Sequence, residues 1–186
     1  MEESHQIELD EPVELRAYDR IWSETYRYES NRLNLKLRGH VVAVEHIGST
    51  AVPGLRSKPI VDIMVGVRAV GLRIEVIAPL LDEYESLGLA GVPGRLYFRK
   101  RGKHAVNVHV VEYLGKHWQD NILIREYLRA HPKEADRYGQ FKDRILAEGS
   151  CTLIAYSRAK QAIMDQLLSD AGEWRDLSGP EAGIDT

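Results

Sequence analysis

Residues 44–55 have the sequence VEHIGSTAVPGL and residues 58–65 the sequence KPIVDIMV, and these two stretches decide the fold. An apolar run from Val41 to Ile47 stops at Gly48-Ser49, and a second run from Ile60 to Val67 carries one carboxylate, Asp62. This pattern predicts a strand, a tight turn and a second strand. Glycine at a strand exit lets backbone N–H groups approach an anion, and a carboxylate on the next strand can hold a metal ion against it. The layout indicates nucleotide chemistry.

The motif resembles the signature of the nucleotidyltransferase superfamily, in which Gly-Ser is followed, after a spacer, by two acids separated by one residue. Asp62 matches the first acid, after a spacer from Thr50 to Val61. The second position is Met64, which lies on the same strand face because side chains alternate along a strand. Phosphoryl transfer by two metal ions needs several carboxylates, so this substitution argues against catalysis.

A more specific resemblance is to the GrpB family, and it extends from about Tyr18 to about Leu168. It implies a nucleotidyltransferase-like fold and a nucleotide-related role, without an established reaction. Residues 124–129 are IREYLR where the family often has FRDYLR, a conservative departure. The matching segments are HIGSTAVPG (46–54), KPIVDI (58–63), VHV (108–110), YLR (127–129), Tyr138 with Lys142, and Tyr156 with Lys160.

The composition predicts one cytoplasmic domain over residues 1–170, followed by a disordered tail over residues 171–186. With 186 residues, 44% of them hydrophobic, the chain can bury a substantial core. Its net charge of −3 makes nucleic acid an improbable partner and favours a phosphorylated or acidic small molecule. No apolar run is long enough for a membrane span, and the single cysteine, Cys151, fits a reducing compartment.

Apolar periodicity and turn residues predict an α+β fold, a mixed sheet flanked by helices with a helical C-terminal half. The predicted strands are 41–47, 60–67 and a short 89–92, with a hairpin formed by 95–100 and 104–112. The predicted helices are 12–38, 74–87, 118–130, 132–148 and 152–169.

Asp62 is the main candidate for a metal ligand and catalytic acid. An ionised carboxylate in a strand buried on both faces is costly unless it is paired or metal-bound, and Mg²⁺ or Mn²⁺ would suit it. The alternative is a salt bridge to Lys58 or to an arginine from the C-terminal helices. Lys58 is also a candidate for binding the substrate.

His109 is the second candidate, as a metal ligand or general base, provided that its strand lies beside that of Asp62. The alternative is a hydrogen-bonded core histidine. Asn107 shares the face of His109, whereas Glu45 and His46 lie on opposite faces of their strand, so only one of them can face a shared site.

The remaining candidates are substrate-binding residues. Gly48, Ser49 and Thr50 could cradle a phosphate, although a purely structural turn is the alternative. The hairpin is rich in cations, of which Arg95 and Arg99 are the better ligand candidates; the alternative is solvated charge at a hairpin tip. Three pairs of residues have members four positions apart, so each pair shares one helix face. If the three helices converge on the sheet, the pairs form a cationic wall opposite Asp62; the alternative is that the lysines only pack along buried tyrosines. These pairs are Arg125 with Arg129, Tyr138 with Lys142, and Tyr156 with Lys160.

The leading hypothesis is a domain that binds a nucleoside triphosphate with Mg²⁺ and transfers a nucleotidyl group to a small acceptor. The main alternative is a catalytically inactive relative that keeps the pocket for binding or regulation, for which Met64 is the chief argument. A third hypothesis is a nucleic-acid-binding module that uses the basic hairpin. The acceptor, the base preference and the oligomeric state stay open.

Overall fold

The computed structural model describes residues 11–68, 74–150 and 152–178, and its centre is a five-stranded mixed sheet. The strands are β1 (Val41–Ile47), β2 (Ile60–Val67), β3 (Glu85–Ser86), β4 (Arg95–Lys100) and β5 (Ala105–Glu112), in the order β1-β2-β5-β4-β3. β2 and β5 are parallel, and the other neighbours are antiparallel. The α+β class is confirmed.

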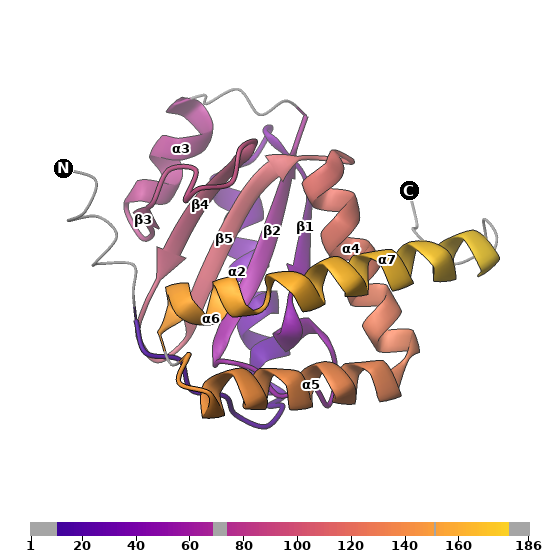
Figure 1. Cartoon of the computed structure of the whole chain (residues 1–186). Helices are drawn as coiled ribbons and strands as arrows, with labels where there is room; N and C mark the ends of the chain where they lie inside the picture. The colour runs from indigo at the N-terminus through magenta and orange to yellow at the C-terminus, as the bar shows by residue number, and fades with distance from the viewer. Residues whose placement is uncertain (1–10, 69–73, 151, 179–186) are drawn as a thin grey trace.

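Helices cover both faces of this sheet (Figure 1). The helix α2 (Ile21–Lys36) lies behind the sheet, and α3 (Ile74–Leu81) lies at its upper edge. The opposite face carries α4 (Lys116–Ala130), α6 (Leu153–Ala159) and α7 (Gln161–Ser178), while α5 (Pro132–Ala147) runs across the lower end. A short 3₁₀ helix, η1 (Ser49–Ala51), follows β1.

The two faces have separate apolar cores. Behind the sheet, α2 buries Trp22, Leu33 and Leu37 against alternate residues of the central strands, among them Ile63 and Val108. On the front face, a smaller cluster under α4 joins Ile47, Met64, Val111, Trp118 and Ile122. Because both faces are covered, the side chains of β2 from Val61 onward are buried, with the exception of the half-buried Asp62.

The predicted strands 41–47 and 60–67 and the hairpin are confirmed, whereas the predicted helix 12–38 is too long at its start. It begins only at Ile21. The preceding segment instead forms isolated β-bridges with residues distant in sequence, Pro12 with Thr152 and Arg16 with Ser57. The predicted helix 74–87 ends at Leu81, and residues 85–86 pair with β4 instead. Residues 89–92 form a turn with positive φ at Ala90 rather than a strand.

The C-terminal end also differs from the prediction. The expected helix 152–169 is two helices, and the second continues to Ser178. Ala171 is fully buried in it, because α7 packs along α4. The prediction of a disordered tail is therefore wrong for residues 171–178, which are helical. Residues 179–186 lie outside the described part of the chain. No helix within the described residues has the length and hydropathy to cross a membrane.

Candidate functional site

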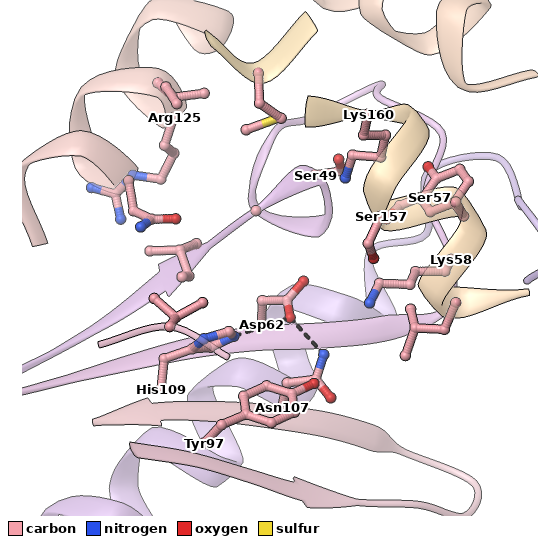
Figure 2. A pocket seen from close by; sticks show the side chains of 18 of the residues that line it. Ser49, Ser57, Lys58, Asp62, Tyr97, Asn107, His109, Arg125, Ser157 and Lys160 are labelled. Carbon is pink, nitrogen blue, oxygen red and sulfur yellow. Dashed lines mark hydrogen bonds and ion pairs between the residues drawn. The ribbon is translucent and has the colours of Figure 1, made fainter. Parts of the chain in front are cut away.

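A pocket of about 510 Å³ lies on the front face of the sheet, where β2, β5 and the Gly48-Ser49 turn face α6 (Figure 2). Strand register places its central polar side chains together, because Asp62 is aligned with Asn107, and Tyr97 with His109. The charged and polar residues of the lining are Ser49, Ser57, Lys58, Asp62, Arg95, Tyr97, Asn107, His109, Asn121, Arg125, Tyr138, Tyr156, Ser157, Arg158 and Lys160.

Asp62 is the anionic centre of this pocket. Its Oδ1 accepts a hydrogen bond from Asn107 Nδ2 at 2.7 Å and lies 3.4 Å from His109 Nε2. Burial opposes ionisation, but the charge of Lys58 and the bonds from His109 and Asn107 outweigh it and hold the pKa of Asp62 below its usual value. Asp62 is therefore ionised at neutral pH. A direct salt bridge to Lys58 is not formed in the described structure, although Lys58 extends toward the carboxylate (Figure 2).

His109 lies between Asp62 and Arg95. Arg95 Nη1 is 3.4 Å from His109 Nδ1, and a guanidinium can only donate, so Nδ1 accepts and Nε2–H faces Asp62. Burial lowers the pKa of His109 more than Asp62 raises it, so the ring is neutral. The strand of His109, β5, lies beside the Asp62 strand, β2, as the candidate role of His109 required. Both nitrogens of the His109 ring have protein partners.

The Gly48-Ser49 turn closes one side of the pocket. Gly48 has φ +70°, a conformation that disfavours other residues, and it packs directly on Asp62. Ser49 lines the pocket and receives a hydrogen bond of 3.1 Å from Lys142 Nζ. Thr50 is different, because it is fully buried and bonded to His46 Nε2 at 2.9 Å. Of Glu45 and His46, the strand register puts Glu45 on the face of the pocket, while His46 stacks on Tyr26 of α2.

Lysines from two elements reach the pocket. Lys58 is half-buried, and burial lowers its pKa even though Asp62 raises it. Lys160, at the end of α6, lies over the rings of Tyr156 and Tyr138, with its Nζ 5.2 Å and 5.7 Å from their centroids. Among the described residues, neither lysine forms a salt bridge with a carboxylate.

The hairpin arginines separate into two groups. Arg95 lines the pocket, and its Nε is buried without a hydrogen-bond partner in the described structure. Arg99 instead pairs with Glu85, through Nε at 2.6 Å. Lys100 pairs with the buried Glu29, and Arg101 pairs with Glu11. The alternative of solvated charge at the hairpin tip therefore applies only to Lys103, which is exposed, among the five described hairpin cations.

The three helical pairs converge only in part. Arg125 lines the pocket but is bound to Glu45 and to the backbone of His46. Arg129 lies outside it and donates two hydrogen bonds to the carbonyl of Ala51.

The tyrosines and lysines of the other two pairs pack together. Tyr138, Tyr156 and Lys160 line the pocket, whereas Lys142 is 1% exposed behind the turn, over the Tyr138 ring. Burial, aided by the charge of Lys160, lowers the pKa of Lys142 to about 6.

Met64 occupies the second acid position of the motif, and helix α4 covers it. Its side chain is fully buried in the apolar cluster under α4, with Trp118 and Ile122. Within the described residues, no group of three or more histidine, cysteine, aspartate or glutamate side chains is arranged to hold a metal ion.

Asn107 and Tyr97 are site residues that the sequence did not single out. Their partners lie on neighbouring strands and follow from the strand register, which pairs Asn107 with Asp62 and Tyr97 with His109; Asn107 is 1% exposed. The alternation that puts Asn107 on the face of His109 was the available signal.

Comparisons with known proteins show similarity to curated sequences and to solved structures. The UPF0157 protein YqkA of Bacillus subtilis is 31% identical over 169 residues, and the match covers 88% of this chain. It covers 48% of YqkA, so the chain spans about half the length of that relative. A structure of Cid1 in complex with its short product ApU aligns over 68% of this chain and 40% of its own, with 13% identity and a TM-score of 0.46.

Family membership rests on broader matches. The crystal structure of the conserved protein GrpB from Enterococcus faecalis aligns with a TM-score of 0.75 and 29% identity, covering 87% of this chain and 100% of that one. The family described as GrpB protein matches residues 12–170, nearly the whole described part of the chain. The chain belongs to the GrpB family, and its sheet and helices form an α+β fold.

Proposed function

We propose that the pocket binds a phosphorylated small molecule, with a nucleoside triphosphate as the first candidate. The observation that carries the proposal is the charge of the lining. Asp62 is the only carboxylate among the described lining residues, and the lining also contains Lys58, Arg95, Arg158 and Lys160, which have no salt bridge in the described structure. A ligand with several negative charges would neutralise this excess.

The buried cations support an anionic ligand on energetic grounds. Lys58 and Arg95 both have pKa values lowered by burial, so holding their charge in this pocket is unfavourable without a counter-ion. The Arg95 Nε–H has no partner either, and leaving such a donor buried costs about 1–3 kcal/mol. Phosphate groups supply negative charge and hydrogen-bond acceptors together. A ligand with a single carboxylate has less charge and fewer acceptors to offer these cations.

The residues around Asp62 fit a divalent cation that is shared with the phosphates of a ligand. Asp62 Oδ1 is held by Asn107 and His109, while Oδ2 has no hydrogen-bond partner among the described residues. Mg²⁺ is commonly bound by one or two carboxylates plus substrate phosphates, and Mn²⁺ accepts the same oxygen ligands. When bound, such an ion would neutralise and orient the phosphates. Because both nitrogens of His109 have partners, its part in this proposal is to orient Asp62.

Nucleotidyl transfer to a small acceptor is the second candidate. It is favoured by the contact between Asp62 and the Gly48-Ser49 turn, which keeps the first acid of the motif beside the proposed phosphate site. The burial of Met64 under α4 removes the usual second carboxylate and favours binding or regulation without transfer. The two candidates differ in release of pyrophosphate, which only transfer from a triphosphate produces.

Thermal unfolding tests the proposal. Nucleoside triphosphates, diphosphates and inorganic phosphate, each with and without Mg²⁺ or Mn²⁺, are added to the wild type, Lys58→Met and Lys133→Met. Lys133 is an exposed lysine of α5 and serves as the control. A ligand at a hundred times its Kd should add about 2.7 kcal/mol of stability to the wild type and to Lys133→Met, but less to Lys58→Met. No stabilisation of the wild type by any phosphorylated compound at millimolar concentration would refute the proposal.

A further inference from the structure

The segment of residues 11–16, which we name the strap, joins two parts of the chain that are distant in sequence. At one end the Glu11 carbonyl accepts a hydrogen bond of 2.8 Å from Leu153 N, at the start of α6. At the other end Arg16 and Ser57 exchange two backbone hydrogen bonds, of 2.8 Å and 2.9 Å. Leu153 and Ser57 both line the pocket, so the strap holds two of its walls together.

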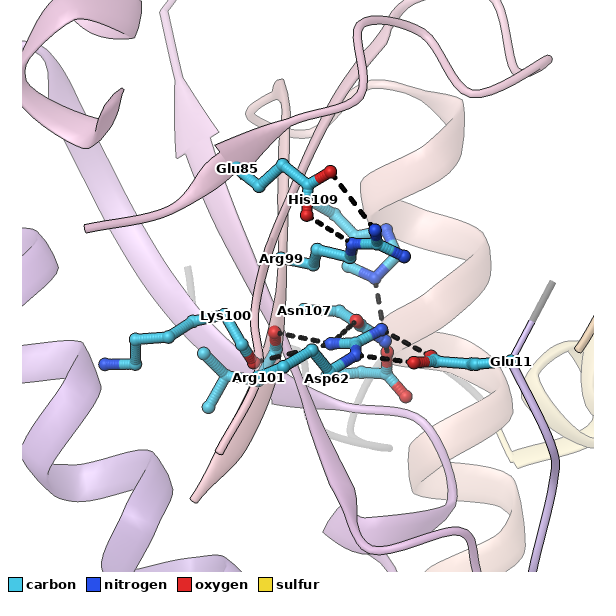
Figure 3. A network of polar contacts seen from close by, with 9 residues as sticks. Glu11, Asp62, Glu85, Arg99, Lys100, Arg101, Asn107 and His109 are labelled. Atoms are coloured by element: carbon cyan, nitrogen blue, oxygen red, sulfur yellow. Dashed lines mark hydrogen bonds and ion pairs between the residues drawn. The ribbon is translucent and has the colours of Figure 1, made fainter. Parts of the chain in front are cut away.

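The side chain of Glu11 begins a continuous polar network that ends at Asp62 (Figure 3). Arg101 binds the Glu11 carboxylate with two hydrogen bonds, Nε to Oε2 at 2.9 Å and Nη2 to Oε1 at 2.6 Å. Arg101 Nη1 donates to Asn107 Oδ1 at 3.0 Å, and Asn107 Nδ2 donates to Asp62 Oδ1 at 2.7 Å. Glu11 and Arg101 are partly buried, and Asn107 is 1% exposed.

The chemistry of this network allows only one orientation of the Asn107 amide. A guanidinium is only a donor and an ionised carboxylate is only an acceptor. The Asn107 oxygen must therefore face Arg101, and its NH₂ group must face Asp62. The reversed amide would set donor against donor and acceptor against acceptor in a buried position, where unmade hydrogen bonds are costly.

The position of Arg101 is in turn set by Glu11. A bidentate pair between guanidinium and carboxylate fixes the plane of the guanidinium as well as its place. The pKa of Glu11 agrees, because burial would raise it but the hydrogen bonds and charge of Arg101 bring it below its usual value. Without this carboxylate, the long Arg101 side chain would lose its one bidentate partner and keep single contacts with Asn107, Tyr97 and backbone carbonyls.

We infer that Glu11 is a positioning residue for Asp62, acting through Arg101 and Asn107. The network holds Asp62 Oδ1, while Oδ2 lies beside Gly48 without a hydrogen-bond partner among the described residues and is the oxygen left for a ligand. The part of this inference that concerns a ligand rests on the proposed function. The part that concerns the orientation of Asn107 and Asp62 is a property of the ligand-free protein.

Glu14 provides a matched control on the same strap. Its carboxylate pairs with Arg16 at 3.0 Å, but the pair is exposed, with 70% of the Glu14 side chain accessible. If the acidic strap residues only added stability through charge, Glu11→Gln and Glu14→Gln would have similar effects on the pocket. If Glu11 positions Asp62, only Glu11→Gln changes the Asn107 amide.

The test is nuclear magnetic resonance of the full chain without ligand, observing the side-chain N–H signals of Arg101 and Asn107. Arg101→Lys and Asn107→Ala assign these signals. In the wild type and Glu14→Gln, the Arg101 Nε–H and the Asn107 amide protons should exchange slowly with water. In Glu11→Gln their exchange should be about tenfold faster, because two carboxylate oxygens that accept from Arg101 are replaced by one amide oxygen and an NH₂ group that cannot accept. Unchanged signals in Glu11→Gln would overturn the inference.

A second measurement separates this inference from the proposed function. ATP with Mg²⁺ is titrated into the same proteins, and Glu11→Gln should bind about tenfold more weakly than Glu14→Gln, as expected for a loss of about 1.4 kcal/mol. If the wild type binds no nucleotide but the exchange result holds, the proposed function fails and the positioning role stands. If Glu11→Gln does not fold, Arg101→Lys replaces it, because lysine keeps the positive charge but cannot form the bidentate pair with Glu11. Asn107 amide protons that exchange as slowly in Arg101→Lys as in the wild type would overturn the inference.

Discussion

Gly48 packs so closely on Asp62 that a β-carbon at Gly48 would lie 2.9 Å from Asp62 Oδ2 and 3.3 Å from Asp62 Cβ. The turn and the carboxylate therefore form one unit. Glycine is required here for two independent reasons, the positive φ of +70° and the lack of space for a side chain.

Gly48→Ala should lower the stability of the protein by more than Gly54→Ala. Gly54 is the matched control, because its φ is +82° but nothing lies within 4 Å of an added β-carbon. Gly54→Ala should cost only the backbone strain, about 1–2 kcal/mol. Gly48→Ala adds displacement of the Asp62 carboxylate. Chemical denaturation measures both, and equal losses for the two variants would show that the Gly48–Asp62 contact is not tight.

Met64→Asp should destabilise the protein rather than restore a metal site. A carboxylate at this position would be buried among the apolar side chains of Trp118, Ile122 and Val111, at a cost of several kcal/mol. Met64→Leu, which keeps the volume, should cost less than about 1.5 kcal/mol. Urea unfolding with and without Mg²⁺ measures the effect, and a Met64→Asp protein as stable as the wild type that gains Mg²⁺ binding would contradict the burial argument.

Lys142 should make stability depend on pH in an unusual direction. Its pKa of about 6 in the folded protein is below the unfolded value, so between pH 6 and the unfolded pKa the unfolded chain binds the extra proton. Stability from this group therefore rises as the pH rises through that window, by at most about 1.4 kcal/mol per pH unit.

Unfolding of the wild type, Lys142→Met and Lys133→Met from pH 6.5 to 9 tests this. Lys142→Met should flatten the rise, while Lys133→Met, at an exposed position, should keep it. Lys58, whose pKa is also lowered, contributes in the same direction, so part of the slope should remain in Lys142→Met. A slope that Lys142→Met leaves unaltered would mean that Lys142 is charged in the folded state.

The basic hairpin should bind nucleic acid only weakly and in a salt-dependent manner. Three of its cations are already paired, Arg99 with Glu85, Lys100 with Glu29 and Arg101 with Glu11. Fluorescence anisotropy with a labelled oligonucleotide at physiological salt measures this. Nanomolar affinity that is lost when Arg99, Lys100 and Arg101 are replaced together would support a nucleic-acid function instead.

The sequence predicted the parts of the fold that depend on local pattern. The strands at 41–47 and 60–67 have the predicted ends, because each apolar run is bounded by turn residues or charge. The segment 12–20 has a helical stripe in Leu15 and Tyr18, yet it forms β-bridges with Ser57 and Thr152. Those partners are distant in sequence, and local periodicity contains no information about them.

The candidate site shows the same division. Asp62, His109 and the Gly48-Ser49 turn were predicted together, and strand pairing brings them together. The neighbours that define their chemistry were not predictable, because Asn107 aligns with Asp62 only in the observed parallel register, and Glu11 reaches it through Arg101 from the strap. Likewise, the burial of Met64 depends on where α4 packs, which its own strand does not encode.

Lys160→Met should weaken binding of a phosphorylated ligand more than Lys133→Met. Lys160 is half-buried at the pocket without a carboxylate partner in the described structure, and it lies over Tyr138 and Tyr156. Removing one charge-assisted contact should cost about 1.5–3 kcal/mol of binding free energy, roughly ten- to hundredfold in Kd. Calorimetric titration of ATP measures it, and equal affinities for the two variants would exclude Lys160 from the site.

The most direct test of the account is the Mg²⁺ dependence of ATP binding in the wild type and in Asp62→Asn. Asp62 is the only carboxylate among the described pocket residues, so it alone can share a cation with the phosphates there. Calorimetry should show that Mg²⁺ strengthens ATP binding to the wild type and that Asp62→Asn loses this strengthening, while still binding metal-free ATP through its cations. Binding of ATP with Mg²⁺ that is as strong in Asp62→Asn as in the wild type, or no binding to the wild type at all, would contradict the account.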